Sequence, residues 1–67
     1  MTLEEFAKNP DNCVFASALI TFKQEYNTFD YGFLSGWLLA LSSAGKLIQS
    51  DFDSLYNELD TIWGDDV

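Results

Sequence analysis

Apolar residues recur along this chain at intervals of three and four positions, which is the spacing of one face of an α-helix. No stretch alternates apolar and polar residues as a half-buried strand does. The widest apolar stripe lies near the end of the chain and holds Phe52, Leu55, Tyr56, Leu59, Ile62 and Trp63. An earlier stripe holds Phe15, Ala18, Leu19, Phe22 and Tyr26, with a narrower apolar edge of Cys13, Ala16 and Ile20. The pattern predicts an all-α protein.

Capping signals set the expected ends of four helices, over residues 3–8, 10–26, 29–44 and 51–63. The expected N-terminal caps are Thr2, Asn9, Thr28 and Ser50, and the first and last of these form capping-box patterns with Glu5 and Asp53. Gly45 and Gly64 are expected to end the third and fourth helices. We therefore expect one domain over residues 1–67, a small bundle of three main helices plus a short N-terminal helix. Residues 64–67 are expected to form a flexible acidic tail.

The third predicted helix has two unlike sides. Its bulky side carries Phe33, Leu34, Trp37, Leu38 and Leu41, whereas its other side carries mainly glycine, alanine and serine. Gly32 and Gly36 each cost about 1 kcal/mol relative to alanine inside a helix, and close approach of another helix is the usual compensation. That helix belongs either to this chain or to a second copy or partner, and both alternatives stay open. The residues predicted for this packing or dimer contact are Gly32, Ser35, Gly36, Leu39 and Ser43.

The segment YGFLSGWLLALSSAG, residues 31–45, is the most apolar stretch of the chain and contains no charged residue. As a helix it spans about 22 Å, whereas the hydrocarbon core of a bilayer is about 30 Å thick. Asp30 and Lys46 flank it directly. We therefore expect no membrane span. The acidic start of the chain also predicts no secretory signal, so the expected location is the cytoplasm.

The composition argues against most catalytic and metal-binding chemistry. The chain has no histidine and one cysteine, so it lacks the usual general base, an internal disulfide and the ligands of a structural zinc site. Cys13 precedes three apolar residues, and we expect its thiol to be buried and inert. The segment DFDSLYNELD does not fit a calcium loop, because Tyr56 stands where the loop requires glycine. We therefore predict a protein that is not an enzyme and has no catalytic residues, metal site or cofactor.

Acidic residues dominate the charge of the chain and gather near its end. Eleven Asp and Glu against three Lys give a net charge of −8, and residues 51–67 contribute −6 of it. This balance argues against direct binding of nucleic acid or an anionic membrane, and it favours a larger protein with a basic surface as the partner. The acids border the last apolar stripe, and Asp60 sits in the expected last turn, where the helix dipole disfavours a carboxylate. The residues predicted to bind the partner are Asp53, Tyr56, Glu58, Asp60, Trp63, Asp65 and Asp66.

The segment GKLIQSDFDSLYNELDTI, residues 45–62, resembles the C-terminal helical hairpins of small acidic proteins from phages and mobile elements. In those proteins a glycine, a short apolar pair and a serine cap precede an acidic amphipathic helix. The resemblance implies an accessory or inhibitor protein of the anti-CRISPR or DNA-mimic type, acting in a host cytoplasm. The alternative prediction is a homo-oligomeric structural or assembly protein that pairs its aromatic and Gly/Ser helix faces. Eleven aromatic residues are more than so short a chain can bury easily, which favours an interface in either case.

Overall fold

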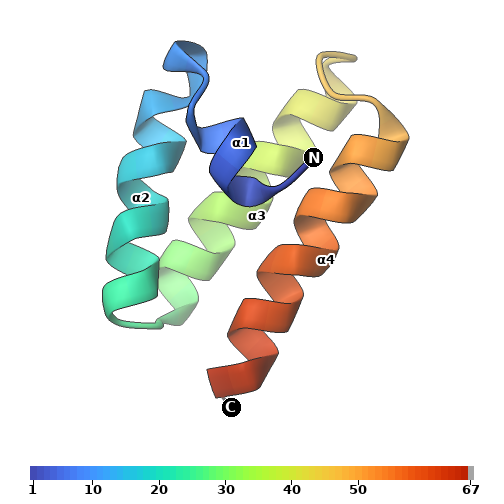
Figure 1. The fold of residues 1–67 in the computed structure, drawn as a ribbon. Helices are drawn as coiled ribbons and strands as arrows, with labels where there is room; N and C mark the ends of the chain where they lie inside the picture. Colours follow the sequence, from blue (N-terminus) through green and yellow to red (C-terminus); the bar gives the residue numbers. More distant parts are fainter. Residues whose placement is uncertain (67) are drawn as a thin grey trace.

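Helix α3 (Thr28–Ser43) runs through the middle of the fold, with α2 (Cys13–Gln24) on one side and α4 (Gln49–Asp66) on the other (Figure 1). The short helices α1 (Leu3–Ala7) and η1 (Pro10–Asn12) come first, and α1 lies across the open side between α2 and α4. This computed structural model describes the backbone of residues 1–66 and the side chains of residues 1–64. The predicted fold, an all-α bundle of three main helices and a short N-terminal helix, is confirmed over that range. None of the described helices is long and apolar enough to cross a membrane.

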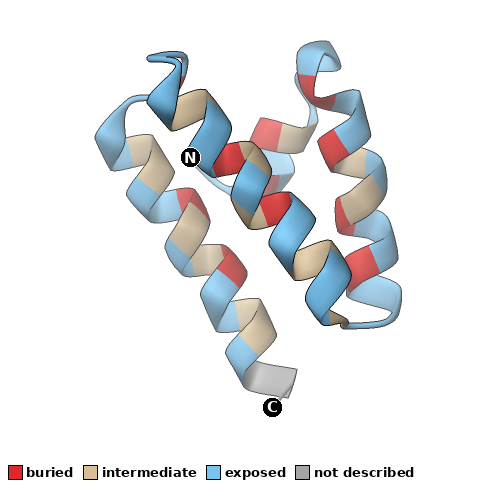
Figure 2. Ribbon diagram, turned by 180° about the vertical axis from the view of Figure 1, so that it is seen from behind, coloured by how far each residue is buried: buried red, intermediate tan, exposed pale blue. Residues whose placement is uncertain are grey.

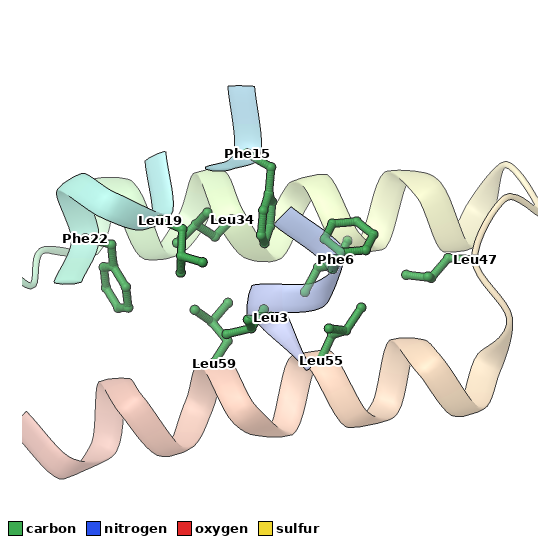
Figure 3. Close-up of a cluster of buried hydrophobic side chains, with 10 residues drawn as sticks. Leu3, Phe6, Phe15, Leu19, Phe22, Leu34, Leu47, Leu55 and Leu59 are labelled. Atoms are coloured by element: carbon green, nitrogen blue, oxygen red, sulfur yellow. The ribbon is translucent and has the colours of Figure 1, made fainter. Parts of the chain in front are cut away.

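The hydrophobic core draws on α1 as well as on the three long helices. Leu3 and Phe6 of α1 point into the space between α4 and the other two helices (Figure 3). The remaining buried apolar side chains are Phe15, Leu19, Phe22, Leu34, Leu38, Leu47, Leu55 and Leu59. Those from α2 and α4 all belong to the predicted apolar stripes. Full burial of one such side chain stabilises a fold by about 1.5–3 kcal/mol, so α1 contributes substantially despite its length.

The narrower apolar edge predicted for α2 is not part of the core. Cys13 is exposed, so the expectation of a buried thiol was wrong. Ile20 is 61% exposed as well. Both residues lie on the far side of the helix from Phe15 and Phe22, which face α3 and α4. Only one apolar face of α2 can meet the rest of the bundle, and the larger side chains occupy it.

Side-chain caps start the first two helical segments. Thr2 Oγ1 accepts a hydrogen bond from the Glu5 N–H at 3.1 Å, and Glu5 Oε1 accepts one from the Thr2 N–H at 3.1 Å. The predicted capping box is therefore confirmed. Asn9 also caps as predicted, but the turn that follows it is a 3₁₀ turn with Pro10 at its start. The α-helix itself begins three residues later than expected, at Cys13.

Asn27 organises the turn between α2 and α3. Its Oδ1 accepts a hydrogen bond from the Asp30 N–H at 2.8 Å, so Asn27 caps α3 and the predicted cap, Thr28, is the first helical residue. Its Nδ2 donates to the carbonyl oxygen of Glu25 at 3.0 Å. Glu25 is extended, and α2 therefore ends at Gln24, earlier than the expected residue 26.

Gly45 ends α3 as predicted, through a left-handed backbone conformation with φ of 75°. The Gly45 N–H donates to the carbonyl of Ser42 at 3.1 Å, and the Lys46 N–H donates to the carbonyl of Leu41 at 2.9 Å. This pair of hydrogen bonds is the Schellman motif, which satisfies carbonyls that the helix end leaves unpaired. The motif turns the chain back toward the bundle, where Leu47 is buried.

Both ends of α4 differ from the prediction. The helix begins at Gln49, so Ser50 lies inside it and does not cap it. The Asp53 carboxylate instead accepts a hydrogen bond from Gln49 Nε2 at 2.8 Å. At the other end the helix continues through Gly64 to Asp66, because Gly64 does not adopt the positive φ that ends a helix. The expected tail over 64–67 is thus helical as far as Asp66, and Val67 lies outside the described residues.

We expect Gly45→Ala to lower the free energy of unfolding by about 1 kcal/mol, because a Cβ disfavours the left-handed conformation. Gly64→Ala is the matched control: Gly64 is helical and a Cβ there meets nothing within 4 Å. It should raise the unfolding free energy by up to about 1 kcal/mol. Urea unfolding followed by circular dichroism measures both values. A loss of stability in both variants would contradict this account of the two glycines.

We expect the Cys13 thiol to react in the folded protein. Because the side chain is exposed, a chromogenic disulfide reagent should modify one thiol per chain in native buffer. The rate should match that measured in urea within about tenfold. Protection of the thiol until the protein unfolds would show that Cys13 is buried after all.

Candidate functional site

The predicted partner-binding acids lie on two edges of α4. Asp53 and Asp60 share one edge, two helical turns or about 10 Å apart, and both side chains are exposed. Tyr56 lies between them along the same edge and is half-buried. We call Asp53, Tyr56 and Asp60 the acidic row. Glu58 lies on the opposite edge, toward α1, and is half-buried.

Each of these carboxylates accepts a hydrogen bond from a neutral donor within the chain. Asp53 accepts one from the Gln49 side chain, and Asp60 accepts one from the Tyr31 hydroxyl of α3. Neutral donors orient the two carboxylates without cancelling their charge. The acidic row is therefore held in place by α3 and α4 while its negative charge faces solvent.

Glu58 has a different role from the acidic row. Its Oε1 accepts a hydrogen bond from the backbone N–H of Leu3 at 2.9 Å. That N–H is in the first turn of α1, where helical N–H groups lack backbone partners and favour a negative charge. Glu58 thus fastens α1 to α4. A partner that bound this carboxylate would have to replace its hydrogen bond to the Leu3 N–H.

Trp63 packs within the bundle as well. Its ring stacks on Phe22 of α2 with centroids 5.9 Å apart and leans on Tyr31 of α3 at 5.1 Å. The indole is half-buried and packs against the core. The structure therefore places Trp63 at the meeting point of three helices. The side chains of Asp65 and Asp66, also predicted to bind, lie outside the described residues.

The hydrogen bond between Tyr31 and Asp60 changes the acidity of the phenol. The Asp60 carboxylate, together with the neighbouring Tyr56 hydroxyl, raises the pKa of Tyr31 well above its ordinary value of 10.0. The cause is that a phenolate would lose this hydrogen bond and face a negative charge. Protonated Tyr31 is thus part of the contact between α3 and α4.

The outer face of α3 carries the residues predicted for helix packing, and none of the described helices covers it (Figure 2). A Cβ built on Gly32 or Gly36 would meet nothing within 4 Å. The alternative in which α2 or α4 packs closely against these glycines is therefore wrong, because both helices pack against the Leu34 and Leu38 side. Leu39 and Ser43 are exposed too, while Ser35 is half-buried and donates to the carbonyl of Gly32 at 3.2 Å.

A cleft of about 480 Å³ lies where α1 and η1 meet the connection from α3 to α4. Its apolar walls include Phe6, Trp37 and Leu47, and its charged groups are the carboxylates of Glu5, Asp11 and Asp51 and the ammonium of Lys46. The buried Asn12 connects this region, because Trp37 Nε1 donates to its Oδ1 at 3.3 Å and its Nδ2 donates to the Phe6 carbonyl at 3.1 Å. None of the predicted site residues lines this cleft. Its residues come from separate segments, so no local sequence signal marks them.

A scan against protein-family models and searches of curated proteins and of solved structures find no match for this chain. No described cluster of three or more Cys, Asp or Glu side chains in residues 1–64 could hold a metal ion. The acidic row and the outer face of α3 are the two surfaces of the described residues that bear on function.

We expect Tyr31→Phe to reduce the dependence of stability on alkaline pH. The raised pKa means that the folded state favours the protonated phenol, so its contribution is fully present below about pH 10 and is lost as pH rises further. Wild-type protein should therefore lose more unfolding free energy between pH 8 and pH 11 than the variant, measured by urea unfolding. Tyr26→Phe is the control and should behave as wild type, because Tyr26 is 36% exposed and its contact is with the Phe22 ring rather than with a carboxylate. Equal pH dependence in all three proteins would remove this role of Tyr31.

Proposed function

We propose that this protein is a non-enzymatic binding module that docks the acidic row of α4 onto a basic surface of a larger protein. The observation that supports this most is the arrangement of the row: two exposed carboxylates about 10 Å apart, with Tyr56 between them. The Gln49 side chain and the Tyr31 hydroxyl orient these carboxylates in advance. Preorganised charge of this kind loses little side-chain entropy on binding.

The proposed interface is narrower than the set of residues predicted from the sequence. Glu58 and Trp63 make contacts within the bundle, with Leu3 and Phe22, so we do not include them in the proposed interface. Because α4 continues to Asp66, Asp60 is not in the last turn, and its position no longer opposes the helix dipole there. Exposure and orientation, rather than an unfavourable local position, are what support a binding role for Asp60.

A groove that normally receives nucleic acid is the basic surface that best fits an acidic partner of this size. The chain carries a net charge of −8, so it would be attracted to such a groove and would be repelled by nucleic acid itself. The resulting action is competitive occlusion, as in phage-encoded inhibitors of the anti-CRISPR type. Association should then slow as salt screens the charges.

We expect the double variant Asp53→Lys, Asp60→Lys to weaken binding to the partner at least tenfold, which corresponds to a loss of about 1.4 kcal/mol. Affinity capture followed by mass spectrometry identifies the partner, and titration calorimetry at 50 and 300 mM salt measures the affinity. Capture supports the proposal only if nucleic acid and this protein exclude each other from the captured partner. Circular dichroism checks that the variant remains helical.

The matched control is Glu4→Lys, Glu25→Lys, which changes the net charge by the same amount at exposed positions outside α4. It should weaken binding less than threefold, because only long-range attraction is reduced. Equal losses in the two double variants would mean that total charge matters and the acidic row does not. Unchanged affinity after reversal of Asp53 and Asp60 would exclude the proposed docking edge.

A further inference from the structure

The outer face of α3 is an uncharged surface that the long helices leave open. Phe29 is 80% exposed, Leu39 is 58% exposed and Phe33 is 38% exposed. Between these side chains little projects from the helix backbone, because the other exposed residues of the face are small. They are Gly32, Gly36, Ala40 and Ser43. The exposed fraction of Phe29 is unusual for this protein, since most of its other aromatic rings are packed against neighbours.

This face differs in charge from the surfaces of α1, η1 and α4. None of its residues is ionisable, whereas α1, η1 and α4 all carry exposed carboxylates. A basic partner would be attracted to those carboxylates rather than to this face. A second copy of the chain, also with net charge −8, could approach most easily where neither molecule presents an acid.

The order of large and small residues makes the face complementary to itself. Gly36 lies at the midpoint between Phe29 and Ser43. At 100° per residue, Phe33 and Ala40 fall along one edge of the face, and Gly32 and Leu39 along the other. A two-fold axis that passes at the level of Gly36 relates two antiparallel copies of α3. Each edge of one helix then lies beside the same edge of the other, and the N-terminal end of one helix lies beside the C-terminal end of the other.

Under that axis each bulky side chain meets a small one. Phe33 of one copy faces Ala40 of the other, Leu39 faces Gly32, and Phe29 lies at the level of Ser43. The two Gly36 backbones come together at the axis. A face that fits its own copy in this way is the requirement for a closed two-fold dimer.

We propose that two copies of this protein pair through the outer faces of α3, antiparallel, about a two-fold axis at Gly36. The residues of the face offer on the order of 500 Å² per copy, or about 1,000 Å² in total, which is near the lower limit for a specific interface. This area and the mutual repulsion of two acidic chains fit a dimer of micromolar affinity. Because salt screens that repulsion, the dimer tightens as salt rises.

Sedimentation equilibrium tests the pairing, over 1–500 µM protein at 50 and 500 mM salt, with a reductant to keep Cys13 from forming intermolecular disulfides. We expect a monomer–dimer equilibrium whose Kd falls at least threefold at the higher salt. Gly36→Leu should raise the Kd at least tenfold, since its side chain would separate the helices at the axis. The Gly36→Leu variant should still fold, because the space around Gly36 is open. Phe29→Ser, at a position that is 80% exposed, provides a second disruptive variant.

The matched control is Ile48→Ser, which removes an apolar side chain that is 66% exposed but lies outside α3. It should leave the Kd within twofold of wild type. A strict monomer at 500 µM in 500 mM salt would overturn the proposal. So would a dimer whose Kd is unchanged by both Gly36→Leu and Phe29→Ser, because another surface would then form it.

Cysteine cross-linking tests the register of the two helices. In a Cys13→Ser background, Gly36→Cys should form a disulfide between two copies in oxidised glutathione, because a residue on a two-fold axis lies next to itself. Ser17→Cys, exposed on α2, is the control and should cross-link at least tenfold more slowly. Equal rates would overturn the proposed axis. Asp53→Lys, Asp60→Lys should not weaken the dimer, so failure of the docking proposal and failure of this one are distinguishable.

Discussion

Burial of Leu3 and Phe6 between α2 and α4 is the contact on which the rest of the bundle depends. Helix α3 packs against both neighbours, but α2 and α4 would leave an open side between them if α1 were absent. Leu3 is completely buried and Phe6 is 6% exposed, and the Phe6 ring meets the edge of Phe15 at 5.0 Å. Removing a buried side chain of this size typically costs 2–5 kcal/mol, a large part of the stability of a small domain.

The same contact explains why the carboxylates of α4 are not equivalent. Glu58 accepts the Leu3 N–H and holds α1 over the core, so its charge serves the fold. Asp53 and Asp60, on the other edge, are oriented by neutral donors and keep their charge exposed. Because α1 must be held in place, the carboxylates on the two edges of α4 differ in role: Glu58 serves the fold, whereas Asp53 and Asp60 remain exposed.

The two proposed binding surfaces have opposite physical character. Docking through the acidic row would gain from long-range attraction and weaken with salt, whereas pairing through the outer face of α3 would have to overcome repulsion and would strengthen with salt. They lie on different helices, so a dimer formed through α3 leaves the α4 rows of both copies accessible. Two such rows on one dimer would raise the avidity for a basic surface wide enough to contact both.

The sequence by itself determined the helical class, the apolar faces of α2 and α4, the Thr2 capping box and the end of α3 at Gly45. These features depend on periodicity and on contacts between residues close in the chain, which local chemistry dictates. The sequence did not reveal that Asn27 rather than Thr28 caps α3, because both residue types cap helices and the choice depends on the preceding turn. It also placed Cys13 in the core, since apolar neighbours along the chain do not show which side of a helix meets the bundle.

Only the tertiary structure decided which predicted surfaces remain available. Glu58 and Trp63 belong to the acidic and aromatic pattern of α4, yet their partners are Leu3 and Phe22, residues far away in the sequence. The cleft beside Asn12 has no sequence signature, because its walls come from segments that meet only on folding. Gly32 and Gly36 indicated close approach of a helix, but α2 and α4 pack on the opposite side of α3, and none of the described helices covers the two glycines. Burial and partnership depend on contacts between distant residues, and the spacing of residues within one helix cannot specify them.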